Sequence, residues 1–343
     1  MSAPTANDEG GGRTEPVGWG FLGAGQMARV MSGVLPAAAN ARLVAVGARD
    51  AARAAAMRPE LDYTAYGSYE AVLADPDIEV VYIALANDAH LPWTVAALEA
   101  GKHVLCEKPL AMNAGEVDQM SAVAQETGRL LVEASWYRWH PRVVLAQEQL
   151  AAGAIGTVRH VSAGFTFGGV AADNYRNSPD KGGGALYDVG CYALSAMLWA
   201  VGRGLPAEVV ARQDLAETGV DLTTDAVLTW DDDTEGDMRA GITGGEGQWL
   251  VIRGERGEIE LRDAPYTSWI ASPTELWVSD GRGTERIPVP PADPYLEMLH
   301  AVSARVRGGG DWVLPLAESR DTAAVIDACF ASARAGSEPV RVG

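Results

Sequence analysis

The sequence is poor in cysteine and lacks two common signatures of catalytic sites. Its three cysteines, Cys106, Cys191 and Cys329, are scattered and form no CxxC pair, which excludes a disulfide framework. We expect Cys106 and Cys191 to be buried as small apolar residues. No cysteines and histidines stand at zinc-ligand spacing and no GxSxG motif is present, so we expect neither a metal site nor a serine hydrolase.

Positive charge and long apolar runs are also lacking. The formal net charge is −19, which disfavours nonspecific attraction to nucleic acid or to an anionic membrane, because both are negative. No run of about 18 apolar residues occurs, and the N-terminal stretch MSAPTANDEGGGRTEP has no apolar signal-peptide core. The sequence therefore predicts a cytoplasmic protein that binds a small molecule, without a membrane or nucleic-acid partner.

The 343 residues, 48% of them hydrophobic, suffice for two cores. Residues 1–15 are polar and aperiodic, so we expect a disordered tail. From 16 to 134, short apolar runs alternate with alanine-rich helical segments, which predicts an α/β domain with a doubly wound parallel sheet. Its strands are expected at 17–22, 42–48, 63–66, 79–85, 103–106 and 130–134.

The pattern changes in residues 135–343, where alternating stretches predict antiparallel strands and hence an α+β domain. The strands are expected at 157–167, 208–212, 226–229, 238–243, 249–253 and 258–261. Helices are expected at 141–152, 184–201, 293–306 and 316–334. The acidic run 230–236 is typical of a solvated loop between two strands rather than of a metal site.

A glycine-rich loop follows the first expected strand and opens a helix. The loop reads Gly-Ala-Gly-Gln-Met-Ala from Gly23, which is the GxGxxA form of the dinucleotide fingerprint in its required context. Gly23 permits the tight turn, Gly25 lets main-chain N–H groups approach a pyrophosphate, and Ala28 permits close helix packing. We expect this loop, with Gln26 and Met27, to bind a dinucleotide, against the alternative of an ordinary strand-to-helix turn.

The end of the second strand distinguishes the two nicotinamide dinucleotides. An acidic residue there would accept the ribose hydroxyls and repel a 2′-phosphate, but the position is occupied by Ala48. The neighbouring Arg49 can stack on adenine and pair with the phosphate, which favours NADP(H) over NAD(H). The alternative is a solvated Arg49 and ribose binding by Asp50.

Further cofactor contacts are expected after the strand at 79–85, because ligands of open parallel sheets lie at the carboxyl ends of the strands. Asn87 and His90 could contact the nicotinamide ribose or the phosphates. Helix capping by Asn87 or Asp88 is the competing interpretation.

Two other motifs carry groups for proton transfer. The strand at 103–106 ends in Glu107-Lys108-Pro109, which delivers a lysine to the same edge of the sheet. A glycine run, residues 182–184, precedes a predicted helix in which Asp188 and Tyr192 lie four residues apart and therefore share a face.

Together these motifs resemble the Gfo/Idh/MocA family, which contains glucose-fructose oxidoreductase, inositol dehydrogenase and rhizopine-catabolism oxidoreductases. The resemblance extends from Val17 to the C-terminus. Segments 66–70, 105–109 and 185–192 are most similar to dimeric dihydrodiol dehydrogenases and deoxysugar 3-ketoreductases, which favour NADP(H). The resemblance implies a sugar-like substrate and a Rossmann domain followed by a large, mostly antiparallel open sheet. It also implies a homodimer or homotetramer formed through that sheet.

The resemblance implies that Lys108 is the family's lysine and that Tyr192 is the acid/base residue, where many members have histidine. A free tyrosine ionises near pH ~10, so we expect the Lys108 ammonium to stabilise the phenolate and lower the pKa of Tyr192. Tyr192 would donate a proton to a carbonyl oxygen that is also bonded to Lys108, while the cofactor delivers hydride. Pro109 is expected to follow a cis peptide, as in relatives.

Asp188 and Glu107 are expected to assist this pair. Asp188 would bind a substrate hydroxyl or orient the two groups, with helix capping as the alternative. Glu107 would support the lysine or the nicotinamide ribose.

The aromatic segment after the last Rossmann strand faces the same crevice. Trp136 and Tyr137 could stack on a sugar ring, and Arg138 could bind hydroxyls or a phosphate. Packing between the domains is the competing interpretation for each.

Three functions fit these features. The first is an NADPH-dependent ketoreductase of a sugar, including a nucleotide-linked ketosugar. The second is a catabolic diol, aldose or polyol dehydrogenase. The third is a non-catalytic protein that senses NAD(P), which the presence of both Lys108 and Tyr192 disfavours.

Overall fold

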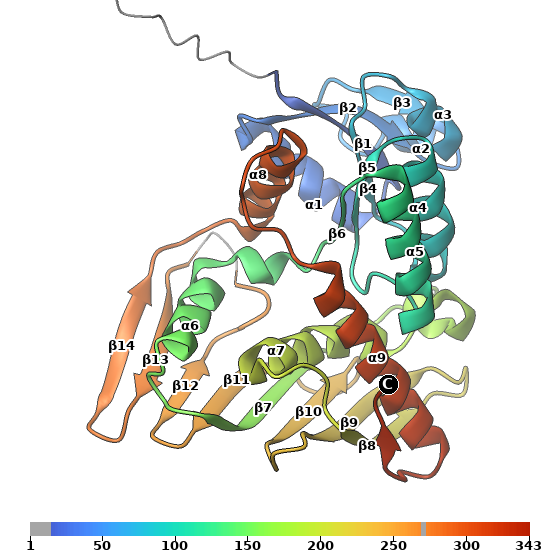
Figure 1. The fold of residues 1–343 in the computed structure, drawn as a ribbon. Coiled ribbons are helices and arrows are strands. Elements are labelled where there is room, and N and C mark those ends of the chain that lie inside the picture. The colour runs from blue at the N-terminus through green and yellow to red at the C-terminus, as the bar shows by residue number, and fades with distance from the viewer. Residues whose placement is uncertain (1–14, 269–271) are drawn as a thin grey trace, which may run out of the picture.

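The N-terminal sheet has the strand order of a dinucleotide-binding fold. The computed structural model describes residues 15–268 and 272–343, so almost all of the expected tail lies outside the described residues. Six parallel strands are ordered β3-β2-β1-β4-β5-β6, which is the Rossmann order (Figure 1). They are β1 (Val17–Leu22), β2 (Ala41–Gly47), β3 (Thr64–Tyr66), β4 (Val80–Ile83), β5 (His103–Cys106) and β6 (Leu131–Glu133), all at the expected places.

Helices cover both faces of this sheet, and side-chain caps fix where several of them begin. They are α1 (Gln26–Val34), α2 (Ala51–Ala55), α3 (Tyr69–Ala74), α4 (His90–Glu99) and α5 (Ala114–Thr127). The side chains of Asp50, Ser68 and Asn113 each accept a hydrogen bond from a main-chain N–H three residues on. The helix starts therefore lie at the edge where the strands end, which is the edge that binds ligands in such sheets.

The second sheet has nine strands in the order β14-β13-β12-β11-β7-β10-β9-β8-β15, and its neighbours are antiparallel except β7 and β10. It is the large, mostly antiparallel sheet that the family resemblance implies. The strands are β7 (Val158–Thr166), β8 (Glu208–Leu215), β9 (Asp221–Thr229), β10 (Glu235–Gly241), β11 (Gly247–Gly254), β12 (Glu258–Leu261), β13 (Thr274–Ser279), β14 (Thr284–Val289) and β15 (Val340–Arg341).

Three of these strands were not predicted. β13, β14 and β15 lie at or near the edges of the sheet, where one face or one long side is open to solvent. Most residues of β14 are exposed and the strand contains Pro288, so the apolar alternation that marks a half-buried strand is absent. β13 and β14 pair with each other as a hairpin joined by residues 280–283, whereas β15 pairs with β8, which is distant in sequence.

One face of the large sheet is covered by α6 (Pro141–Ala151), α7 (Cys191–Val201) and α9 (Leu316–Arg334) (Figure 1). The apolar stretch Pro179–Val201 is long enough to span a membrane by length and composition, but 83% of its apolar window is buried inside the fold. The helix expected at 184–201 is interrupted: Leu186–Gly190 form a π-helical turn before α7 begins.

The C-terminal helices connect the two halves. α8 (Pro294–Val306) packs on the Rossmann half, where the indole N–H of Trp19 donates to Ser303 Oγ at 3.1 Å and the Asn40 amide donates to the His300 carbonyl at 3.0 Å. α9 contacts α5 as well as α7. The boundary at 134/135 stays a prediction, because the chain crosses between the two sheets more than once.

Candidate active site

Lys108 and Tyr192 come together at the carboxyl edge of the parallel sheet. The Glu107 N–H extends the pairing of β5 to the Ile83 carbonyl at 3.0 Å, and the Lys108–Pro109 peptide is cis, as expected. Lys108 Nζ donates to the main-chain carbonyl of Asp188 at 2.7 Å and lies 4.8 Å from the centroid of the Tyr192 ring. This hydrogen bond thus joins two segments that are 80 residues apart in the sequence.

The glycine run before the π-helical turn allows this approach. Gly184 has φ of +110°, and a Cβ there would lie 2.0 Å from a carboxylate oxygen of Asp221. A Cβ at Gly183 would lie 2.5 Å from the Arg176 carbonyl oxygen. Asp221 in turn accepts the Leu186 N–H at 2.8 Å, which fixes the start of the turn. π-helical turns often occur at functional sites, and this one carries Asp188.

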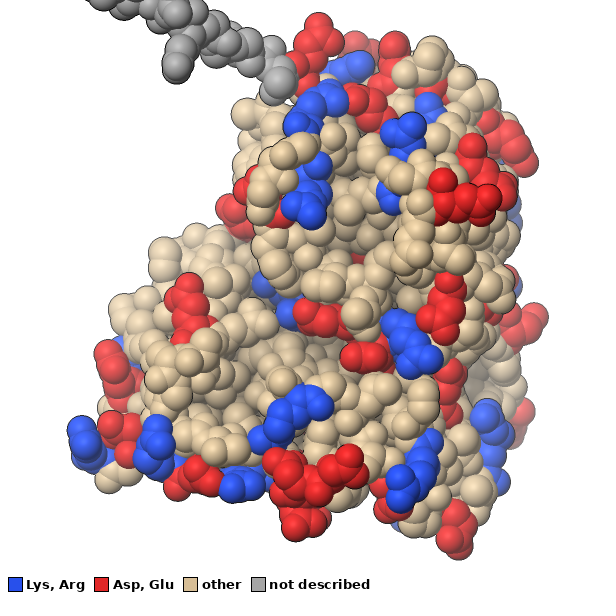
Figure 2. Space-filling model, viewed as in Figure 1, with Lys and Arg blue, Asp and Glu red and all other residues tan. Residues whose placement is uncertain are grey.

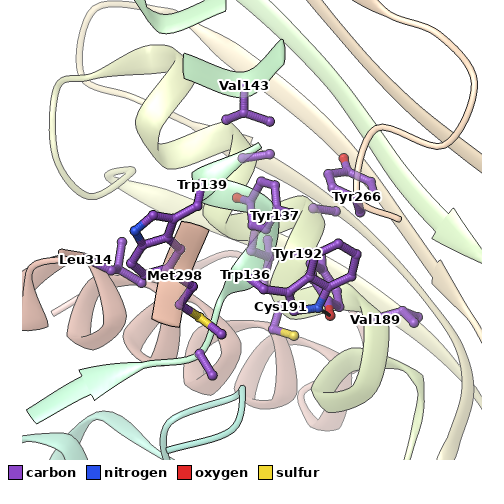
Figure 3. Packing of buried hydrophobic residues seen from close by; sticks show 14 of the residues in the cluster. Trp136, Tyr137, Trp139, Val143, Val189, Cys191, Tyr192, Tyr266, Met298 and Leu314 are labelled. Carbon is purple, nitrogen blue, oxygen red and sulfur yellow. Dashed lines mark hydrogen bonds between the residues drawn. The ribbon is translucent and has the colours of Figure 1, made fainter. Parts of the chain in front are cut away.

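Tyr192 lies in a buried aromatic cluster (Figure 3) and is only 6% exposed. Its hydroxyl oxygen accepts the Trp136 indole N–H at 3.0 Å. The rings of Tyr137, Phe165 and Tyr266 have centroids 5.6, 5.7 and 5.9 Å from the Tyr192 centroid. The bond from Trp136 uses a lone pair of this oxygen, so the hydroxyl keeps its own proton as a donor.

The expected lowering of the Tyr192 pKa is wrong. Burial raises the pKa well above 10, and the Lys108 ammonium, which acts in the expected direction, does not offset it. A buried phenolate is destabilised by the surrounding aromatic rings, and this effect is larger than the stabilisation that the phenolate gains from a lysine over the ring face. Tyr192 is therefore protonated at neutral pH and carries a proton that it can donate.

Asp188 is held by Arg176, a residue that the sequence interpretation missed. Arg176 Nε lies 2.6 Å from Asp188 Oδ2 and its Nη2 lies 2.9 Å from Oδ1, while the Asp188 side chain is 5% exposed. Burial alone would raise the pKa of Asp188, but Lys108 and Arg176 outweigh it and hold the pKa below its ordinary value. The capping interpretation of Asp188 is wrong, because the N-cap residues of the π-helical turn and of α7 are Ala185 and Gly190, and both Asp188 carboxylate oxygens are bonded to Arg176.

The Glu107 carboxylate contacts the main chain of Lys108. Its carboxylate is 5% exposed, accepts the Tyr82 hydroxyl proton at Oε1 and lies 3.3 Å from the Lys108 main-chain N–H at Oε2. Burial raises the pKa of Glu107, and the hydrogen bond from Tyr82 and the nearby lysine oppose that shift. The carboxyl therefore orients the main chain of Lys108.

The glycine loop forms a cradle that fits a pyrophosphate. Gly23 has φ of +108°, and a Cβ there would lie 2.5 Å from the Ala84 carbonyl oxygen. Gly25 caps α1 without any side-chain hydrogen bond, and nothing lies within 4 Å of the position of a Cβ. Main-chain N–H groups at a helix start with open space before them are the usual binding site for an anion. Gln26 and Met27 form the first turn of this helix.

The end of β2 has the arrangement expected for a 2′-phosphate. Ala48 is buried, and Arg49 beside it is exposed at the edge of the sheet. Asp50, the alternative ribose ligand, accepts the Arg53 main-chain N–H at 2.7 Å as the cap of α2. Arg49 is thus the better placed of the two for the ribose region.

Asn87 and His90 are committed to contacts within the protein. The Asn87 amide donates to the Gly182 carbonyl at 2.8 Å and connects the loop after β4 to the glycine run. His90 is fully buried, with its ring nitrogens 2.9 Å from the Pro109 carbonyl oxygen and 3.4 Å from that of Leu85. We therefore assign His90 to holding the loop that carries Lys108, in place of the expected cofactor contact.

Two residues of the aromatic segment, Trp136 and Tyr137, contact Tyr192. Trp136 contacts Tyr192 as described, but the Tyr137 hydroxyl donates to Ser195 Oγ at 2.9 Å inside the C-terminal half. Arg138 is 2% exposed and forms an ion pair with Glu318 at 2.6 Å. The Tyr137 hydroxyl and the Arg138 Nη1 thus have partners within the C-terminal half, and a substrate contact of either residue stays a prediction.

Other surface features lie away from this centre. A cleft of about 540 Å³ between α3 and α4 and one of about 420 Å³ on the uncovered face of the large sheet are lined by neither Lys108 nor Tyr192. Basic and acidic side chains are interspersed on the face seen in Figure 2. Cys106 and Cys191 are free and buried, as expected for small apolar residues, and so is Cys329.

Comparison with known proteins agrees with this geometry. Two family models match, one described as an oxidoreductase family with an NAD-binding Rossmann fold over residues 17–135 and one as a GFO/IDH/MocA C-terminal domain over residues 143–260. The chain is 36% identical over 309 residues to D-xylose 1-dehydrogenase (NADP(+)) 2 of Haloferax volcanii, covering 89% of this chain and 94% of that protein.

Two further proteins resemble the chain along most of its length. It is 35% identical over 280 residues to trans-1,2-dihydrobenzene-1,2-diol dehydrogenase of Bos taurus, with 80% of each chain covered. A solved structure of a 3-ketoreductase from Actinomadura kijaniata in complex with NADP and TDP-benzene superposes with a TM-score of 0.86 at 25% identity, covering 92% of this chain and 98% of that one.

Proposed function

The chain belongs to the Gfo/Idh/MocA family of oxidoreductases, and from that premise we propose that it transfers hydride between NADP(H) and a ketone or secondary alcohol of a sugar-like substrate. The single observation that carries the proposal is the convergence of Lys108 and Tyr192 at the carboxyl edge of a Rossmann sheet. A protein that only sensed the cofactor would not need a buried proton donor beside an ammonium group.

The cofactor's own contribution is the hydride, which bound NADPH would supply to the carbonyl carbon. The protein residues manage the proton and the charge. Tyr192 donates its phenolic proton to the carbonyl oxygen as that oxygen gains negative charge, and the same oxygen accepts a hydrogen bond from Lys108. The resulting phenolate is stabilised by the Lys108 ammonium and takes a proton from solvent, which restores the resting state.

NADP(H) is the proposed dinucleotide on the strength of Arg49 and Ala48. An exposed guanidinium at the end of β2 can pair with a 2′-phosphate, and no acidic side chain stands at the position that would repel it. The relative from Haloferax volcanii is named for NADP(+), and the ketoreductase structure contains NADP, which supports the same choice.

The direction of the reaction divides two candidate functions. The protonated state of Tyr192 favours reduction of a ketosugar, because the donor is ready at neutral pH. The relatives with higher identity are named as dehydrogenases of D-xylose and of a dihydrodiol, which favours oxidation of an aldose or diol. Both directions use the same proton path, so the choice rests on the substrate.

A paired substrate panel tests the proposal. NADPH oxidation is followed with ketosugars, free and nucleotide-linked, and NADP+ reduction with aldoses, polyols and cyclic diols, each repeated with NADH or NAD+. We expect turnover in at least one panel and a preference for the phosphorylated dinucleotide. Tight NADPH binding without turnover in either panel would favour a sensing protein.

Assembly and location complete the proposal. The uncovered face of the nine-stranded sheet is the surface through which a homodimer or homotetramer would form, and light scattering during size exclusion measures which one is present. The cytoplasm is the proposed location.

A further inference from the structure

Asp188 lies between two cations, Lys108 and Arg176, which bond to different groups of the residue. Lys108 Nζ donates to its main-chain carbonyl at 2.7 Å, whereas the distance from Nζ to its carboxylate Oδ1 is 3.5 Å. Arg176 instead makes two short bonds to the two carboxylate oxygens. The carboxylate is therefore engaged mainly by the arginine, although the lysine is near enough to compete for it.

Several contacts hold Arg176 in place. Asn174 Oδ1 accepts the Arg176 main-chain N–H at 3.1 Å and caps the short turn that carries it. The Arg176 carbonyl oxygen accepts the Gly184 N–H at 2.9 Å, so the glycine run wraps the main chain of the arginine. The guanidinium stands 5.2 Å from the centroid of the Tyr175 ring. Arg176 is thus held against the π-helical turn at both its main chain and its side chain.

The consequence concerns the lysine. A planar guanidinium matches a carboxylate with two parallel bonds, which an ammonium cannot do. With Arg176 on both oxygens, the ion pair between Lys108 and the carboxylate stays long, at 3.5 Å, and the short bond of Lys108 goes to the main-chain carbonyl. The ammonium keeps a further N–H donor for a substrate oxygen. Without Arg176, the long ion pair would shorten to a direct hydrogen bond, because the carboxylate and the ammonium are nearly buried, at 5% and 13% exposure.

We propose that Arg176 is a positioning residue that keeps the Asp188 carboxylate from closing further on Lys108 and so leaves an N–H donor of the ammonium for the reacting oxygen. The proposal rests on the proposed function for its catalytic consequence only. Its structural consequence, a change in the state of the Lys108 amine, can be measured without any substrate.

The first test uses the scarcity of lysine. The chain contains only Lys102, Lys108 and Lys181. Trace labelling with acetic anhydride, read by mass spectrometry of the three lysine peptides, reports the fraction of free amine at each. In Arg176→Ala we expect labelling of Lys108 to fall about tenfold relative to Lys102, because a closer carboxylate and a lost cation both raise the pKa of the amine. In Arg176→Ala/Asp188→Asn the labelling should return to the wild-type level or above.

The second test is a double-mutant cycle on turnover. Arg176→Ala alone should lower kcat by about tenfold or more, but less than about twofold in the Asp188→Asn background, since the arginine acts through that carboxylate. Arg203→Ala is the matched control: its side chain is 31% exposed against 29% for Arg176 and it pairs with Asp232 at 3.2 Å, far from the site. The control should leave kcat and Lys108 labelling unchanged.

The outcomes separate cleanly. Unchanged labelling of Lys108 in Arg176→Ala, or equal losses of kcat in both backgrounds, overturns the proposal. A tenfold fall in labelling in a protein that turns over no sugar, diol or ketone supports the positioning role and rejects the proposed function. If Arg176→Ala does not fold, Arg176→Lys retains the charge without the planar fork, and intermediate labelling in that variant supports the proposal, whereas wild-type labelling refutes it.

Discussion

Removing the phenolic oxygen of Tyr192 is the most direct perturbation of the proposed proton path. Tyr192→Phe keeps the ring, and with it the contacts to Tyr137, Phe165 and Tyr266, but removes both the proton and the acceptor that lies 3.0 Å from Trp136 Nε1. General acids typically contribute 10²–10⁴ in rate, so we expect kcat for ketone reduction to fall by about 10² or more. The affinity for NADPH should stay within about twofold of wild type, since the hydroxyl is not part of the glycine cradle.

A stability effect accompanies the catalytic one and has to be separated from it. Loss of a buried hydrogen-bond acceptor costs about 1–3 kcal/mol of unfolding free energy. Tyr137→Phe is the matched control, because the Tyr137 hydroxyl is equally buried and has two partners, Ser195 at 2.9 Å and the Trp199 indole at 3.2 Å. It should lose at least as much stability and keep turnover near that of wild type.

The assay follows NADPH oxidation at saturating substrate, with cofactor affinity measured by fluorescence and unfolding free energy by urea titration. Because the pKa of Tyr192 is raised, wild-type reduction should show no tyrosine-dependent fall in rate below pH ~10. If Tyr192→Phe turns over as fast as Tyr137→Phe, another group donates the proton and the mechanism is wrong.

Three further perturbations test the cofactor site and the pH response. Arg49→Ala should weaken NADPH binding by about tenfold or more, because a charge-assisted pair with the phosphate is lost, and should leave NADH binding nearly unchanged. Equal losses of affinity for NADPH and NADH would reject phosphate recognition by Arg49. Gly25→Val should weaken both dinucleotides without a change in Tm, since its Cβ enters open space, whereas Gly23→Ala should also lower Tm through its contact with the Ala84 carbonyl. Burial lowers the pKa of His140 from 6.5 to about 4. The neutral imidazole therefore contributes fully to the free energy of unfolding above pH 6.5, and this contribution is lost as the pH falls toward 4. His140→Asn, which can keep the cap of α6, should therefore reduce the loss of unfolding free energy on acidification by up to about 3 kcal/mol, and identical urea titrations of both proteins at pH 7 and pH 4.5 would contradict this.

The Rossmann half was largely predictable because its signals are local. A parallel sheet buried on both faces produces uninterrupted apolar strands, and side-chain caps such as Asp50 and Asn113 mark the helix starts within three residues. The glycine loop is also local, since the positive φ of Gly23 and the open space at Gly25 follow from one strand-to-helix turn. These features lie on one continuous stretch of chain, so their residue types suffice.

The arrangement of the candidate centre depends on the tertiary structure. The sequence indicated that Lys108, Asp188 and Tyr192 carry the chemistry, but not that Arg176 would occupy the Asp188 carboxylate, because the arginine lies in an irregular segment with no periodicity. It also gave the wrong direction for the pKa of Tyr192. A charge partner can be guessed from a motif, whereas desolvation depends on rings that come from several distant strands and helices.

By itself, the sequence determined the dinucleotide fold, the residues proposed to carry the reaction and the burial of Cys106 and Cys191, since each is encoded by neighbours within a few positions. Only the tertiary structure decided which polar groups face the site and which bond to other groups of the protein. His90, Tyr137 and Arg138 are examples of the second kind. The tertiary structure also decided the pairing of the edge strand β15 with β8. The physical reason is the same in both cases: hydrogen bonding and burial between distant segments depend on where the chain folds back, which no local pattern specifies.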